Sequence, residues 1–166
     1  MVSQVVKAID QLAEVHEQLI QTGLAKKQAI LSKELDELMR LMRIESKLSR
    51  EITEMDQERS LVSRKLMMDK GVKNRFNVTY RNLMGVIHDP EERTELQRVH
   101  ERLERAIVQL KQVNDLNQTL LQQSLDFIAF TIDLYLNPED ESYTYKHPAS
   151  PTGDPKNKSG LYNTRA

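Results

Sequence analysis

From Glu91 to Asn137 the sequence contains neither glycine nor proline, the two residues that most often interrupt a helix. Apolar residues recur through this stretch at steps of mostly three and four, which is the spacing of one helix face. The residues before it favour a helix start, because Asp89 can cap the first turn and Pro90 suits the first helical position. We therefore expect one long helix that begins at Asp89–Pro90.

A second long helix is predicted from about Ala25 to Lys70. Its apolar residues lie mostly three or four apart, as in a coiled-coil seam, and they are Leu31, Leu35, Leu38, Leu41, Leu48, Ile52, Met55, Val62 and Leu66. Two seam positions, Glu45 and Arg59, are charged, so we expect irregular packing there. Gly71 supplies the left-handed conformation in which helices commonly end.

Two shorter amphipathic segments complete the pattern of apolar residues. The first runs from Val5 to Leu19 and should end near Gly23. The other runs from Phe76 to Ile87 and should lie as a cap across the end of a helical hairpin.

The expected fold is all-α, a long antiparallel helical hairpin with a short N-terminal helix that forms a partial three-helix bundle. The two long helices would each extend roughly 65 to 75 Å, and the first helix, of about 20 residues, would cover only one end of the hairpin. From Pro138 the sequence is rich in Pro, Gly, Ser and Asn, which cannot sustain a helix. We expect a helical domain at residues 1–137 and a disordered C-terminal tail at residues 138–166.

Charge and composition argue against several classes of function. The formal net charge is -1, and the seven Lys or Arg residues between positions 59 and 81 should be neutralised by the acidic start of the last helix, so we expect no nucleic-acid partner. No segment is apolar enough for membrane insertion, and the first residues lack the apolar centre of a signal peptide. Cysteine is absent, and we expect the protein in the cytoplasm.

Residues for catalysis do not form a recognisable motif. The sequence holds no Gly-rich phosphate loop, no His-Glu-x-x-His metal spacing and no Ser or Cys elbow, so we expect no cofactor, no metal and no enzymatic activity. A remote alternative is an all-α small-molecule enzyme of the chorismate mutase type, built on the seam charges Glu45 and Arg59. These lie about 21 Å apart along one helix and could meet on one substrate only through dimerisation.

The end of the last predicted helix carries more apolar residues than one helix face can hold. Apolar side chains occur on more than one face from Leu120 to Leu136, while Asn114, Asn117 and Ser124 lie on or beside the seam, where they can bond across helices and fix the register. Either the first helix covers this surface or a partner does. An amphipathic partner helix of about 18 residues would bury on the order of 1,000 to 1,500 Å² in total.

The run from Asn117 to Ile128 reads Asn-Gln-Thr-Leu-Leu-Gln-Gln-Ser-Leu-Asp-Phe-Ile. It resembles the C-terminal signature of the FlgN family of flagellar export chaperones, in which Asn-Gln, paired leucines, Ser-Leu and Phe-Ile recur at this spacing. The order of the predicted helices is similar as well, and so is the tail with Pro, Gly and Tyr that ends at Arg165–Ala166. The resemblance is sharp over about twelve residues and loose over most of the chain.

This resemblance implies a cytoplasmic type III export chaperone that binds the C-terminal helical segments of the hook-filament junction proteins FlgK and FlgL and delivers them for flagellum assembly. It allows the export apparatus as a further partner. The partner-binding residues that we expect are Asn117, Leu120, Leu121, Ser124, Leu125, Phe127, Ile128, Phe130 and Leu134. The alternative is a self-associating coiled-coil scaffold or regulator. The sequence leaves open whether the chain is a monomer or a dimer and which junction protein it prefers.

Overall fold

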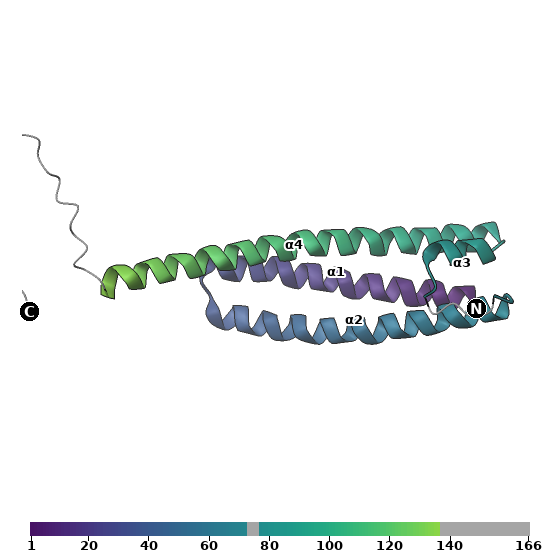
Figure 1. Ribbon diagram of the computed structural model, residues 1–166, viewed down its shortest axis with the longest axis horizontal. Helices are drawn as coiled ribbons and strands as arrows, with labels where there is room; N and C mark the ends of the chain where they lie inside the picture. The colour runs from purple at the N-terminus through teal and green to yellow at the C-terminus, as the bar shows by residue number, and fades with distance from the viewer. Residues whose placement is uncertain (73–76, 137–166) are drawn as a thin grey trace, which may run out of the picture. The chain divides into compact units, whose positions relative to one another are not determined.

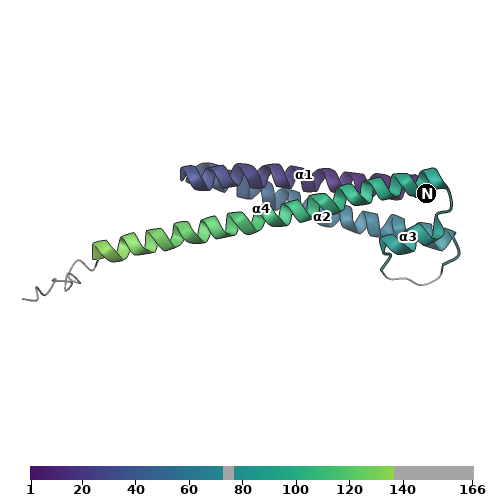
Figure 2. The same ribbon diagram turned by 90° about the horizontal axis from the view of Figure 1, so that it is seen from above.

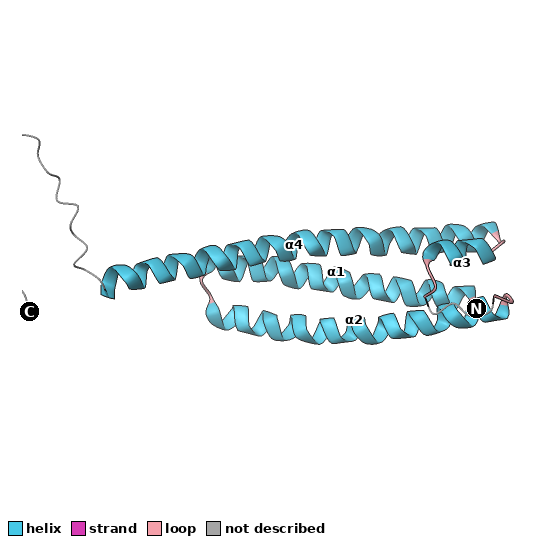
Figure 3. Cartoon of the chain, in the orientation of Figure 1, coloured by secondary structure: helices cyan, strands magenta, loops and turns pink. Residues whose placement is uncertain are grey.

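The computed structural model describes residues 1–72 and 77–136, and these residues form four helices (Figures 1 and 3). The helices are α1 (Val2–Ser32), α2 (Leu35–Asp69), α3 (Tyr80–Val86) and α4 (Pro90–Leu136). No strand occurs in these two ranges, so the all-α prediction is confirmed. The expected tail at 138–166 and Phe76 lie outside the described residues.

The chain divides into two compact units, Met1–Ala129 and Phe130–Ala166. The first unit holds α1, α2, α3 and most of α4. Of the second unit the structure describes residues 130–136, which are the last turns of α4.

The predicted end of the first helix near Gly23 is wrong, because α1 continues to Ser32 and ends where Lys33 adopts a left-handed conformation with φ 58°. Gly23 lies inside α1, where α4 passes so closely that an added Cβ atom would stand 2.6 Å from Cγ1 of Val113. A glycine inside a helix costs about 1 kcal/mol relative to alanine. Here the close approach of two helices, rather than a helix end, accounts for the glycine.

Because α1 ends later than predicted, the next helix also begins later than predicted. The second helix begins at Leu35 rather than near Ala25, so α2 has 35 residues and α4 has 47. The predicted match in length between these two helices is therefore wrong, as is the expectation that the first helix covers one end alone. Instead, α1 has 31 residues and forms the closest helix pair with α2.

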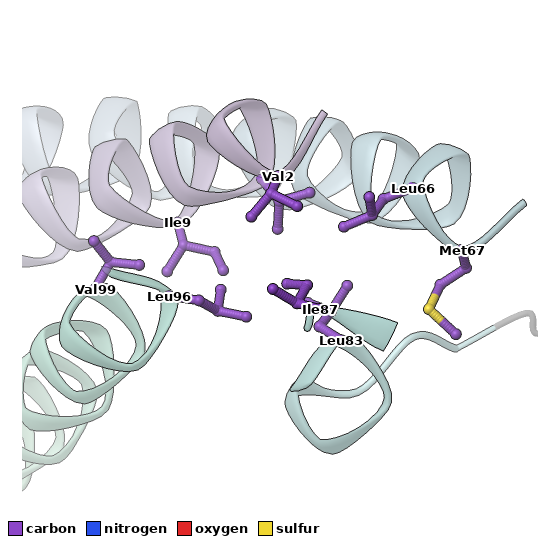
Figure 4. Close-up of a cluster of buried hydrophobic side chains, with 9 residues drawn as sticks. Val2, Ile9, Leu66, Met67, Leu83, Ile87, Leu96 and Val99 are labelled. Carbon is purple, nitrogen blue, oxygen red and sulfur yellow. The ribbon is translucent and has the colours of Figure 1, made fainter. Parts of the chain in front are cut away.

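Within the first unit, Figure 1 shows α1 between α2 and α4, and Figure 2 shows α2 and α4 crossing each other on one side of α1. The three helices form the partial bundle that the sequence predicts. At the end of this bundle that holds the N-terminus, a cluster of buried side chains joins all the helices (Figure 4). The cluster is Val2, Val5, Ile9, Leu66, Met67, Leu83, Ile87, Leu96 and Val99. α3 therefore covers this end of the bundle, as the amphipathic pattern around Leu83 and Ile87 predicts, but it lies along the other helices rather than across their end (Figures 1 and 2).

The helix starts and stops near this cap follow local side-chain chemistry. The Oδ1 atom of Asp89 accepts hydrogen bonds from the backbone N–H groups of Glu91 at 2.8 Å and Glu92 at 3.1 Å, which confirms the predicted start of α4. Thr79 caps α3 in the same way. Gly71, just past the end of α2, has φ 77°, as expected for a helix stop.

Over the two described ranges, no helix combines the length and the apolar character that crossing a bilayer would require.

Candidate partner-binding surface

Arg102 of α4 ties that helix to α1 through two carboxylates. Its guanidinium donates to both oxygens of Glu17, at 2.8 and 2.7 Å, and to Oδ1 of Asp10 at 2.7 Å. The two-pronged bond to Glu17 is the geometry in which an arginine holds a carboxylate most firmly. It lowers the pKa of Glu17 below its ordinary value of 4.5.

Asn117 makes a second polar link between the same helices. Its Nδ2 donates to the backbone carbonyl of Gly23 at 2.7 Å, and the side chain is only 1% exposed. The missing side chain of Gly23 is what allows this contact, since it brings the backbone of α1 within reach of α4. The expectation that Asn117 bonds across helices is confirmed, and its burial removes it from the surface that a partner could touch.

Beyond Asn117 the apolar residues of α4 become progressively exposed. Leu120, Leu121 and Ser124 are half-buried, and the Ser124 hydroxyl donates to the Leu120 carbonyl at 2.9 Å. The exposed fractions are then 58% for Leu125, 62% for Phe127 and 52% for Ile128. In the second unit, Phe130 is 61% exposed and Leu134 is 59% exposed. Within the first unit, α1 therefore leaves the Leu125–Ile128 turn largely uncovered.

Lys33, the residue that follows α1, contacts this turn. The ammonium group of Lys33 lies over the Phe127 ring, 5.6 Å from its centroid, within the range of a cation–π interaction. Because Lys33 is the residue that ends α1, the position of this contact depends on the helix boundary that the sequence pattern misplaces.

Further exposed apolar side chains surround the connection between α1 and α2. Leu31 is 54% exposed, Leu35 66%, Met39 46% and Met42 49%. The sequence pattern assigns Leu31 and Leu35 to a buried seam, and the structure exposes both because the connection between the helices falls between them.

The two seam charges pair with separate neighbours rather than with each other. Glu45 accepts two hydrogen bonds from Lys26 of α1, at 2.9 and 2.7 Å. Arg59 pairs with Asp56 one turn earlier on its own helix, at 2.8 Å. In the described ranges no cluster of three or more His, Cys, Asp or Glu residues could hold a metal ion. Arg59 and Asp56 line a cavity that Glu45 does not line, so Glu45 and Arg59 do not share it, as the chorismate mutase alternative would need.

The link through Arg102 predicts a pH dependence of stability. Because the pKa of Glu17 is lower in the folded protein than its ordinary 4.5, the bond stabilises the fold above that pH, and this stabilisation is lost as the pH falls through the lowered pKa. We expect Arg102→Gln to lose less stability than the unaltered protein when the pH falls from about 7 to about 3. Urea unfolding at both pH values measures this difference.

Arg105→Gln is the matched control, because Arg105 is 72% exposed and lies 3.9 Å from its partner Glu101. Equal acid sensitivity in Arg102→Gln and Arg105→Gln would show that the link to Glu17 contributes nothing.

Comparison with known proteins identifies the family to which the chain belongs. The family described as "FlgN protein" matches residues 1–153, and the chain belongs to this family of flagellar export chaperones. A relative from Bacillus subtilis (strain 168), described as "Uncharacterized protein YvyG", is 22% identical over 162 residues, which cover 98% of this chain and 97% of the relative. No solved structure matches the chain.

Proposed function

We propose that the protein is a cytoplasmic, non-enzymatic chaperone of type III export that binds the C-terminal helical segments of the hook-filament junction proteins FlgK and FlgL. The observation that carries the proposal is the exposed turn of α4 at Leu125, Phe127 and Ile128, each more than half exposed. This turn lies within the segment that bears the family signature. Membership of the FlgN family supports the same reading.

A subunit that is exported must be kept from assembling before export. A helical segment that polymerises does so through an apolar face, and a chaperone that covers this face prevents assembly without using ATP. An exposed apolar turn on a long helix suits such a task, since an amphipathic helix can lie along it with its polar face in water. Large apolar patches on a monomer commonly mark interaction sites.

The experiment is to purify FlgK or FlgL from the same organism with and without this chain and to follow light scattering. We expect the junction protein to copurify with the chain in a complex of defined size and to stay free of aggregates. A chain that forms a stable dimer and leaves the junction protein unbound would contradict the proposal and favour a self-associating scaffold.

A further inference from the structure

A trough runs between α2 and α4, with α1 as its floor. Figure 1 shows α2 and α4 on opposite sides of α1, and α1 packs more closely on α2 than α4 packs on either. Side chains of all four helices line a cavity of about 370 Å³ in this trough, and this cavity is partly open to solvent. Leu12 belongs to its floor, Ile52 to the α2 side, and Leu103 and Ile107 to the α4 side. Most of its surface is apolar, but the side chains of His16, Asp56, Arg59, Tyr80 and His100 also line it.

One end of the trough is already occupied by a helix. This helix is α3 (Figures 1 and 2). Its residue Leu83 is only 2% exposed, and Tyr80 begins its first turn. The Tyr80 ring stacks on His100 of α4, with 3.9 Å between ring centroids and 7° between ring planes. α3 has seven residues and fills only this end, so among the described residues no helix continues along the trough beyond Tyr80.

The α4 side of the trough continues into the exposed turn described above. Leu103, Ile107 and Leu110 are spaced by four and three residues, and Leu121, Leu125 and Ile128 repeat that spacing. At about 3.6 residues per turn, the 25 steps from Leu103 to Ile128 return to nearly the same face of the helix, roughly 38 Å further along. Polar Asn114 and Gln118 lie between the two groups. One stripe of α4 thus borders the cavity and carries Leu125 and Ile128.

We propose that the partner's amphipathic helix docks in this trough, in line with α3, and supplies the missing length of the fourth helix of a four-helix bundle. This inference rests on the proposed function and adds the α2 side of the trough to the binding surface. The occupant is a helix of about 25 residues whose apolar stripe faces α1 and whose polar face lies in water. Two flanking helices and a floor bury more of such a helix than the single face of α4 does.

The side chains that border the trough are open enough to receive this helix. Ile107 is 48% exposed, and Ile52 and Leu103 are half-buried. Val108, the next residue along α4, is 53% exposed and does not line the cavity. Ile107 and Val108 are therefore adjacent apolar residues of similar exposure, of which one borders the trough.

The test compares Ile107→Arg, Ile52→Arg and the control Val108→Arg by calorimetric titration with the C-terminal segment of FlgK or FlgL. A charge on either side of the trough should weaken binding by roughly 30-fold or more, as for a central interface residue, whereas Val108→Arg should change it by less than about threefold. Circular dichroism melts check that each variant folds. If Ile52→Arg unfolds, Ile52→Gln removes the apolar surface without adding a charge.

The outcomes separate this inference from the proposed function. If the unaltered protein binds and only Ile107→Arg weakens binding, the partner lies on α4 alone and the trough inference is overturned. If neither Ile107→Arg nor Ile52→Arg weakens binding, the trough inference is overturned as well. If the unaltered protein binds neither segment, the inference and the proposed function both fall. A dimer of this chain that Ile107→Arg dissociates would identify a second copy as the occupant instead.

Discussion

Replacing Leu96 by alanine is expected to lower the free energy of unfolding by about 2 to 5 kcal/mol, the usual range for a leucine deleted from a packed core. Leu96 is 0% exposed and lies in the cluster that joins α1, α2, α3 and α4 at one end of the bundle. The cavity left by its side chain would face several helices whose positions depend on one another, so little collapse is available to fill it. Urea unfolding followed by circular dichroism measures the change.

Leu125→Ala is the matched control for this experiment, because it removes the same atoms from the same helix at a position that is 58% exposed. We expect its effect to stay within about 0.5 kcal/mol, as for surface substitutions in general. Similar losses in the two variants would mean that the capped end around α3 is not the main core of the first unit.

Leu125→Asp is expected to weaken binding of the junction-protein segment by roughly 30-fold or more, while leaving the stability of the free protein almost unchanged. The side chain is 58% exposed, so a carboxylate there remains in water in the unbound protein. In the complex the same carboxylate would be buried against the apolar face of the partner. The substitution therefore weakens the free energy of binding and leaves the free energy of folding almost unchanged.

Leu116→Asp controls for the added charge. Leu116 is 44% exposed and lies nine residues before Leu125, which at about 3.6 residues per turn places it on the opposite face of α4. Its binding should match that of the unaltered protein. If the two variants bind alike, the Leu125 face of α4 does not carry the partner.

The sequence predicts the elements that local chemistry determines. The start of α4 follows from Asp89 and Pro90, which affect only the first turn of the helix. The length of α4 follows from the absence of glycine and proline between Pro90 and Pro138. Gly71 predicts the end of α2 for the same reason. Each of these signals concerns neighbouring residues and needs no knowledge of how the helices pack.

Gly23 shows where such local reasoning fails. A glycine after an amphipathic run resembles a helix stop, but here α4 approaches so closely that a side chain would collide with Val113. That approach depends on the packing of residues about ninety positions apart in sequence, which no local pattern contains. The actual end of α1 at Lys33 carries no sequence signal, because a lysine only occasionally adopts a left-handed conformation.

The candidate site likewise has features that the local sequence predicts and features that depend on how the helices pack. That the segment from Asn117 to Ile128 binds the partner stays a prediction, whereas the cross-helix bond of Asn117 agrees with its polar seam position. The pairing of Arg102 with Asp10 and Glu17 and the trough beside Ile107 depend on the register between α1 and α4. Spacing along the sequence does not contain that register.

Calorimetric titration of the full chain with the C-terminal segments of FlgK and FlgL from the same organism tests the central claim most directly. We expect saturable binding of one segment per chain at micromolar affinity or better, equivalent to about -8 kcal/mol or more favourable. No heat with either segment, together with a stable dimer in light scattering, would contradict it.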